Sequence, residues 1–167
     1  LDPVLEAITS SLAIDGCQAI RLKANTQREV ISTFGVMPVP ISKKIDVGIN
    51  NRLIFDHRHL RCVAQVTKYQ REVNGLLVAW GNGASGNWND DDLFLFEQCA
   101  DLVGIELEHI ANRERLEVLS TTDQLTGLLN RGTFEKYLTD KVFAQVKARA
   151  PPGVLVFIDF DNFKLIN

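Results

Sequence analysis

The stretch Gly75-Leu-Leu-Val-Ala-Trp80, with Asn-Trp-Asn-Asp-Asp-Asp-Leu at residues 87–93, decides the fold of this 167-residue chain. The first segment is apolar throughout, which is typical of a central strand covered on both faces. The second begins a helix, because Asn89 is a suitable N-cap residue and three aspartates follow where the helix dipole favours negative charge. A buried strand that leads into a long helix predicts an α+β fold.

Further elements are predicted on the N-terminal side of this stretch. The predicted strands are residues 18–23, 28–34, 60–66 and 73–80, the first two forming a hairpin. Residues 5–12 carry apolar side chains at helical spacing. Residues 35–59 are rich in turn formers, which predicts a long connection with short elements, of the kind that often lines a binding site.

The long helix is predicted to continue from Asn89 to about residue 120. Its apolar residues are four and three positions apart, as in a heptad seam: Phe96, Ala100, Val103, Leu107 and Ile110, with Leu116 and Leu119 after a phase shift. At about 1.5 Å per residue, such a helix extends beyond one small domain. We therefore expect a homodimer through the helix near residues 93–120. Packing of the helix on its own sheet is the alternative, and it applies to the first half in either case.

Composition excludes several classes of protein. The net charge of −3 offers no basic excess for a nucleic acid, and the longest apolar runs are too short to span a membrane. Three cysteines without a Cys-x-x-Cys pair favour a reducing, cytoplasmic location. Of these, Cys17 and Cys99 are expected in the core.

Two other motifs are interpreted as loops. Residues 81–86 match the spacing G-x-G-x-x-G, but the aspartates that follow would repel a pyrophosphate. His57, His59 and Cys62 could ligate a metal ion, but a closed zinc site needs four ligands and no other Cys or His lies nearby. A solvated loop that enters a strand is the preferred interpretation.

The C-terminal third contains the most informative chemistry. Thr133 is predicted to cap a second helix with an apolar stripe of Phe134, Leu138, Val142 and Val146. Residues 154–159 then form an apolar run that predicts a buried strand ending in Asp159, with Asp161 two residues on and Lys164 at the start of the next helix. Carboxylates at such a strand end can hold Mg²⁺ together with substrate phosphates. A strand-ending Asp that caps the next helix is the alternative.

Two motifs in order resemble the GGDEF family of diguanylate cyclases. Asp123-Gln-Leu-Thr-Gly-Leu-Leu-Asn-Arg131 is similar to the opening signature of that family. Val154-Leu-Val-Phe-Ile-Asp-Phe-Asp-Asn-Phe-Lys-Leu-Ile-Asn167 resembles its first strand and phosphate loop. Gly132 departs from the pattern, because the family usually has a second Arg there. The resemblance covers residues 121–167 and implies an incomplete, palm-like α/β fragment.

The resemblance implies roles for individual residues in the synthesis of cyclic di-GMP from two GTP molecules. Asp159 and the backbone carbonyl of Phe160 would bind Mg²⁺ or Mn²⁺. The GTP-binding residues would be Asn162, Phe163 and Lys164 at the triphosphate and Asn167 at the guanine. The family's signature loop is expected beyond Asn167, so no catalytic set is complete and this chain alone is expected to be inactive. Each domain would hold one GTP, which agrees with a homodimer.

The N-terminal part resembles a GAF domain, with a central antiparallel sheet, flanking helices and a long C-terminal signalling helix. The expected domains are a GAF-like sensor at 1–111, a helical linker at 112–122 and the truncated start of a GGDEF domain at 123–167. Bilin-binding relatives typically have a Cys next to a His, whereas Cys62 precedes Val63, so covalent bilin is not expected. The GAF ligand is unknown from the sequence.

These resemblances predict the sensory and dimerisation region of a bacterial signalling protein that regulates cyclic di-GMP synthesis. Two alternatives stay open at the level of sequence. In the first, the GAF-like part is a dimerisation scaffold that binds no ligand. The GGDEF part would alternatively be degenerate, binding GTP without turnover.

Overall fold

The computed structural model describes residues 1–23, 27–36, 51–83 and 87–148, together with residues 154, 156 and 158. It divides into two compact units, Leu1–Arg115 and Leu116–Asn167, which are described separately below.

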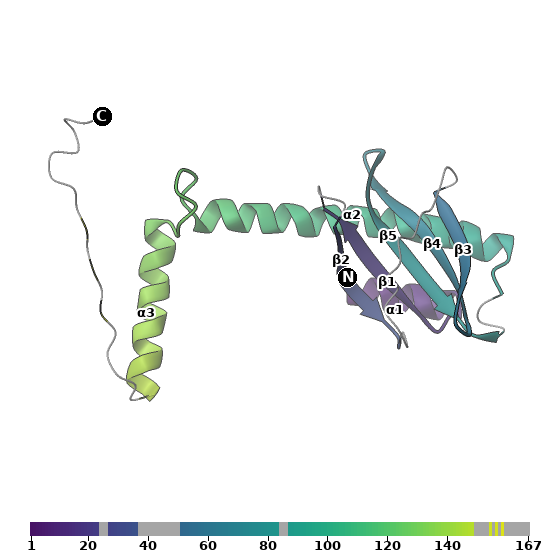
Figure 1. Cartoon of the computed structure of the whole chain (residues 1–167), viewed down its shortest axis with the longest axis horizontal. Coiled ribbons are helices and arrows are strands. Elements are labelled where there is room, and N and C mark those ends of the chain that lie inside the picture. Colours follow the sequence, from purple (N-terminus) through teal and green to yellow (C-terminus); the bar gives the residue numbers. More distant parts are fainter. Residues whose placement is uncertain are drawn as a thin grey trace. The chain divides into compact units, whose positions relative to one another are not determined.

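The first unit is built on a five-stranded antiparallel sheet with the order β2-β1-β5-β4-β3. The strands are β1 (Gly16–Leu22), β2 (Arg28–Phe34), β3 (Arg52–His57), β4 (Leu60–Tyr69) and β5 (Glu72–Gly81). The apolar stretch at residues 75–80 lies in β5, the middle strand, and its side chains are buried on both faces. The predicted α+β fold with a central antiparallel sheet is confirmed (Figure 1).

Strand β3 lies inside the segment that was predicted to be a connection. Its sequence pattern is weak because β3 is an edge strand whose residues are at most half-buried. The β4–β5 hairpin turns through Gln70 and Arg71, which both have positive φ, at 49° and 74°. Such a turn usually has Asn-Gly at these two positions, so the residue types Gln and Arg do not predict the hairpin.

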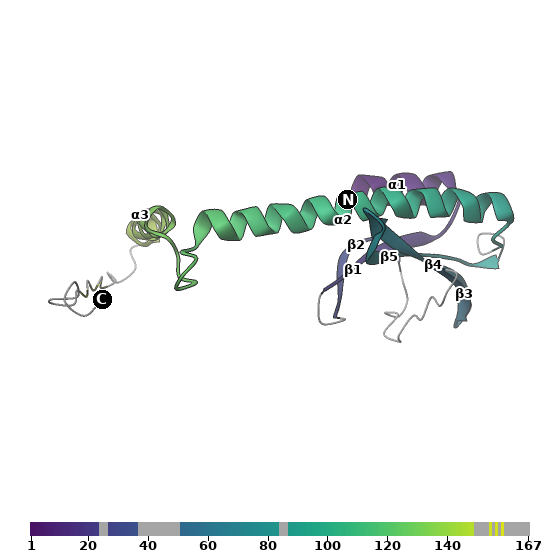
Figure 2. The ribbon, with the colours of Figure 1, turned by 90° about the horizontal axis from the view of Figure 1, so that it is seen from above.

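Helices α1 (Asp2–Ser11) and α2 (Asp90–Thr121) lie on the same face of the sheet, which we call the helix face (Figure 2). The core of this face comprises Leu5, Ile8, Ile14, Cys17, Ala19, Val63, Leu77, Ala79, Phe96, Ala100, Val103 and Leu107. Four of the five residues of the predicted heptad seam are therefore buried against the chain's own sheet, and Ile110 is half-buried. Apolar residues of a helix recur at the same spacing whether they pack on a sheet or on a partner helix, so the sequence alone does not distinguish these two kinds of packing.

The other side of the sheet, which we call the opposite face, has its own apolar cluster. It consists of Ile20, Ala64, Val66, Leu76 and Val78, with Leu53 and Phe55 packed against it. Strand β5 supplies both faces by simple alternation, since Leu77 and Ala79 belong to the helix face.

Helix α2 begins as predicted. The Asn89 side chain accepts a hydrogen bond from the Asp92 amide at 2.9 Å, and the Asn89 amide donates to the Asp92 carboxylate at 3.2 Å. This reciprocal cap satisfies two backbone donors that a helix start leaves unpaired. The helix continues for 32 residues to Thr121. Among the described residues, no helix is long and apolar enough to cross a membrane.

The second unit contains helix α3 (Arg131–Ala148). Its cap is Asn130, whose side chain accepts from the Thr133 amide at 3.0 Å, so the prediction of Thr133 as the cap was wrong. Both residue types cap helices well, and only the backbone path distinguishes them. The predicted apolar stripe of α3 is not a buried face, because Phe134 and Val142 are exposed.

Three residues of the predicted buried strand at 154–159 are described, and the other three lie outside the described residues. Val154, Val156 and Ile158 are exposed and form no strand. A buried strand requires neighbouring strands on both sides, and the described part of the second unit supplies none to these residues.

Candidate functional site

The residues assigned to metal and GTP by resemblance lie outside the described residues. They are Asp159, Phe160, Asn162, Phe163, Lys164 and Asn167. Residues 37–50 of the predicted connection and residues 84–86 of the glycine-rich loop are also outside. Within the described ranges, no group of three or more His, Cys, Asp or Glu side chains is placed to hold a metal ion.

The candidate metal ligands of the first unit are not brought together as a site. Cys62 is buried near the start of β4, where it pairs with Trp80 of β5, and burial raises the pKa of its thiol to about 11, with a smaller effect from Asp56. A neutral, buried thiol is a poor metal ligand, because the thiolate is the binding form. His59 is exposed in the turn between β3 and β4.

The two other cysteines were predicted in the core, and this is confirmed for Cys17. Its thiol is fully buried, lies 3.3 Å from the Thr9 hydroxyl and donates to the Leu5 carbonyl at 3.4 Å. Burial is the main cause that raises the pKa of Cys17 to about 11. Cys99 is only half-buried, and burial raises the pKa of its thiol as well.

One end of the sheet carries a buried polar group that lacks a partner. Trp80 is fully buried in a small cluster with Leu60 and Cys62, and its indole N–H has no hydrogen-bond acceptor among the residues that the structure describes. The ring is held closely, because a Cβ on Gly16 would lie 2.5 Å from it. A buried donor without an acceptor costs free energy, and such groups are often found where function requires them.

Helix α2 is fixed to the helix face at three points along its length. The first point is Arg52 of β3, which donates to the Leu93 carbonyl at 3.1 Å and to the Glu97 carboxylate at 2.8 Å. Arg52 also donates to Gln65 of β4 at 2.8 Å. The start of the helix is therefore tied to the edge of the sheet by a charge-assisted contact.

The second point is a close approach of two backbones at Gly104. A Cβ on this glycine would lie 2.3 Å from the carbonyl oxygen of Lys68 in β4, a separation that real Cβ atoms do not show. The Gly104 carbonyl also accepts a hydrogen bond from Asn74 of β5 at 2.8 Å. Asn74 accepts in turn from the buried Thr67 hydroxyl at 2.9 Å. The middle of α2 is thus seated where the β4–β5 hairpin leaves the sheet.

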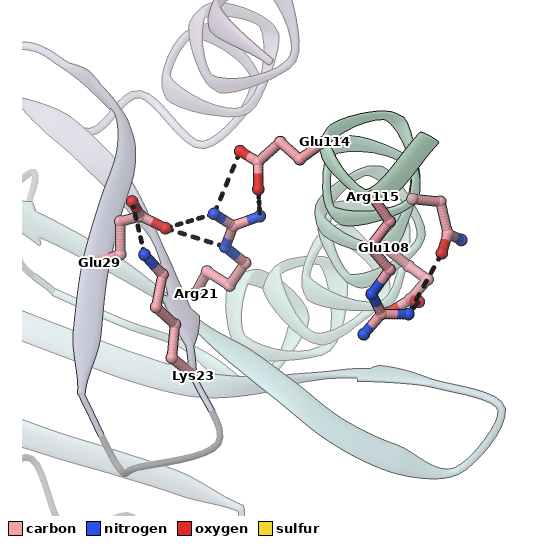
Figure 3. Close-up of polar contacts among 7 residues, drawn as sticks. Arg21, Lys23, Glu29, Glu108, Glu114 and Arg115 are labelled. Atoms are coloured by element: carbon pink, nitrogen blue, oxygen red, sulfur yellow. Dashed lines mark hydrogen bonds and ion pairs between the residues drawn. The ribbon is translucent and has the colours of Figure 1, made fainter. Parts of the chain in front are cut away.

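The third point is an ion-pair cluster near the end of the first unit. The guanidinium of Arg21 in β1 lies between the carboxylates of Glu29 in β2 and Glu114 in α2 (Figure 3). It donates to Glu114 at 2.7 and 3.2 Å and to Glu29 through two nitrogens, one of them at 3.0 Å. Lys23 adds a contact of 3.1 Å to Glu29, so two positive and two negative charges balance. The bonds to Glu114 are the largest cause that raises the pKa of Arg21, and the bond to Arg21 is the largest that lowers the pKa of Glu29.

The signature segment of the second unit forms a turn that its own side chains stabilise. The Asp123 carboxylate accepts from the amides of Leu125 and Thr126 at 3.2 and 2.9 Å and from the Thr126 hydroxyl at 2.8 Å. These bonds, that of the hydroxyl first, lower the pKa of Asp123. Gly127 has a φ of +70°, a left-handed conformation that glycine adopts readily.

Asn130 connects the two sides of this turn. Its side-chain amide donates to the Ser120 carbonyl at 2.7 Å, its backbone amide donates to Thr121 at 2.9 Å, and its side-chain oxygen caps α3. The polar residues of the signature therefore have a structural purpose in the described chain, which is to set the path from the end of α2 to the start of α3.

Comparison with known proteins agrees with both resemblances. Residues 120–167 match the family model described as diguanylate cyclase, GGDEF domain. The fold of the first unit is similar to the folds of solved GAF domains, among them the following three. Their sequence identities to this chain are low, so the similarity concerns the fold alone. One belongs to a candidate sensor histidine kinase of Pseudomonas syringae pv. tomato, with 17% identity, coverage of 69% of this chain and 77% of that chain, and a TM-score of 0.54.

The second is from an Acinetobacter phosphoenolpyruvate-protein phosphotransferase, with 13% identity, coverage of 67% and 82%, and a TM-score of 0.53. The third is the photoproduct state of a GAF3 domain from Synechocystis, with 15% identity, coverage of 68% and 94%, and a TM-score of 0.52. A GAF-like domain is therefore followed by a segment that matches the GGDEF family model. No curated protein matches the chain significantly. The combination of a GAF-like domain with a GGDEF segment indicates a signalling protein.

Proposed function

We propose that this chain is the sensory and coupling region of a cytoplasmic protein that regulates synthesis of cyclic di-GMP from two GTP molecules. The observation that carries the proposal is the continuity of one helix. The first half of α2 is part of the GAF-like core, with Leu107 as its last buried residue, and the helix ends at Thr121, where the GGDEF match has begun. A change in the sheet therefore has a continuous path along the chain to the GGDEF segment.

In this proposal the GGDEF segment retains the roles implied by resemblance. Asp159 and the Phe160 carbonyl would hold Mg²⁺ or Mn²⁺, and the metal would supply stabilisation of negative charge on the phosphates of GTP. Asn162, Phe163 and Lys164 bind the triphosphate. Asn167 binds the guanine edge.

We also propose that the protein acts as a homodimer through α2, but with a different face from the predicted seam. The exposed apolar residues of α2 include a second heptad set at Leu95, Leu102, Ile105, Leu116 and Leu119. Their spacing of 7, 3, 11 and 3 residues keeps them on one stripe of a two-helix coiled coil. This stripe is free while Phe96, Ala100, Val103 and Leu107 are occupied by the sheet.

The enzymatic part is tested with the protein expressed from the complete gene. It is incubated with GTP and Mg²⁺ or Mn²⁺, and cyclic di-GMP is measured by liquid chromatography and mass spectrometry. We expect product from the wild type and none from Asp159→Asn, because the substitution removes a metal-binding charge. GTP binding without product in the wild type would support a degenerate domain and overturn the proposed activity.

The dimer is tested by analytical ultracentrifugation of two single variants. Leu102→Glu places a charge in the second heptad set, so we expect it to convert dimer to monomer. Phe94→Glu is the matched control, since Phe94 is similarly exposed on α2 but lies outside that set. A wild-type monomer, or equal effects of the two substitutions, would refute this interface.

A further inference from the structure

We propose that Arg21 and Glu114 form a releasable clasp that fixes the last part of α2 belonging to the GAF-like domain, with Arg21 as the positioning residue. The proposal concerns where the helix becomes free of its own sheet. It goes beyond the proposed function, which requires only that α2 is continuous, by assigning the release point to one ion pair.

The ion pair lies where α2 has left the core of the GAF-like domain. The last buried residue of α2 is Leu107, and every residue from Asn112 to Ser120 is exposed. Full burial of apolar side chains has therefore ended about two turns before Glu114, and Ile110, one turn before it, is only half-buried. The two hydrogen bonds from Arg21 to Glu114 hold this exposed part of the helix to the sheet.

The two partners of the ion pair differ in their exposure to solvent. Its side chain is only 10% exposed, whereas that of Glu114 is 54% exposed. When Glu114 leaves, the guanidinium keeps Glu29, so the buried charge is not left without a partner. Release therefore avoids the large cost of an unpaired buried charge, and the helix can detach without unfolding the sheet.

The backbone of β1 connects the ion pair to the opposite face of the sheet. Arg21 follows Ile20 in β1, and Ile20 belongs to the apolar cluster of the opposite face. Successive side chains of a strand point to opposite faces, so a displacement of β1 that is caused at Ile20 moves the Cα of Arg21 directly. A ligand or a packing change on the opposite face is thereby transmitted to the clasp.

Hydrogen–deuterium exchange on the whole chain tests the clasp through two matched variants. Glu114→Gln and Glu29→Gln each remove one carboxylate charge from Arg21, but only Glu114 lies on the helix. We expect Glu114→Gln to accelerate exchange of amides in residues 108–118 by roughly 10-fold, the effect of losing a hydrogen-bonded ion pair that opposes local opening. Amides of residues 93–104 should be unchanged. Glu29→Gln should accelerate exchange in β2 and leave the helix unchanged.

Two further measurements keep the test decisive. Glu108→Gln removes a carboxylate that is 3.9 Å from Arg115 on the helix itself, so it controls for a general change of charge on α2. If a variant fails to fold, raising NaCl from about 0.05 to 0.5 M in the wild type should accelerate exchange in residues 108–118, because salt screens an accessible ion pair. Equal exchange in the wild type and Glu114→Gln, or equal effects of Glu108→Gln and Glu114→Gln, would overturn the proposal. The readout needs no GTP, so its failure is distinct from a failure of the proposed enzymatic activity.

Discussion

The substitution Gly104→Ala tests how closely α2 is seated on the sheet. Its Cβ would lie 2.3 Å from the Lys68 carbonyl oxygen and 2.7 Å from the Lys68 amide nitrogen. Ordinary van der Waals contacts begin at 3.4 Å, so either the helix α2 or the β4–β5 hairpin must move by about 1 Å. That movement also strains the 2.8 Å hydrogen bond from Asn74 to the Gly104 carbonyl.

The expected change in the free energy of unfolding follows from two destabilising effects and one stabilising effect. Overpacking in a well-packed core costs about 1–3 kcal/mol. Loss of the Asn74 hydrogen bond costs about 0.5–1.5 kcal/mol. The better helix propensity of alanine stabilises by about 1 kcal/mol. We therefore expect the free energy of unfolding of the GAF-like domain to fall by about 1–3 kcal/mol, which lowers the urea midpoint by roughly 1 M.

Urea unfolding followed by tryptophan fluorescence measures this effect, since Trp80 and Trp88 both lie in the GAF-like domain. Gly132→Ala is the matched control, because a Cβ there has its nearest neighbour at 3.8 Å, within ordinary contact distance. The control should leave the fluorescence transition unchanged. If Gly104→Ala is as stable as the wild type or more stable, helix propensity dominates and the close seating of α2 on Lys68 is refuted.

Three further outcomes are expected. Asn130→Ala should destabilise the start of α3 by about 1 kcal/mol, measured as loss of the helical circular dichroism signal on heating. Asn130→Asp should retain the cap, so equal losses for the two variants would argue against capping. The fold lowers the pKa of Asp123, so its ionised carboxylate stabilises the turn at pH values above the ordinary aspartate pKa of 3.8, and this stabilisation is lost as the pH falls through the lower folded pKa. The NMR resonance of the Thr126 amide should therefore shift only below pH 3.8. A shift at higher pH would contradict the hydrogen bonds to Asp123. The Cys17 thiol is buried and its pKa is raised to about 11, so iodoacetamide at pH 8 should modify the half-buried Cys99 before Cys17, as followed by mass spectrometry. Modification of Cys17 before Cys99 would refute this packing.

The elements that were predicted correctly carry local signals. An apolar run of strand length identified β5, and an Asn cap followed by three aspartates identified the start of α2. These signals depend on residues that are close in the sequence, so no tertiary information was needed. Strand β3 was overlooked because half-buried edge residues next to turn formers give a weak pattern.

The seam of α2 shows a limit of periodicity. Phe96, Ala100, Val103 and Leu107 have the spacing of a partner interface, yet the sheet covers them completely. The clasp shows a second limit, because Arg21 and Glu114 are 93 residues apart and each is an ordinary charged residue in its own segment. No local motif announces such a pair, and only the fold brings it together.

Strand β5 has a consequence for how this domain can diversify. Leu76 and Val78 face one side of the sheet while Leu77 and Ala79 face the other, so neighbouring codons specify separate surfaces. Substitutions at Leu76 or Val78 can remodel the opposite face while the residues that seat α2 remain as they are. Under the proposed coupling, recognition on the opposite face and output through α2 are separable in evolution along a single strand.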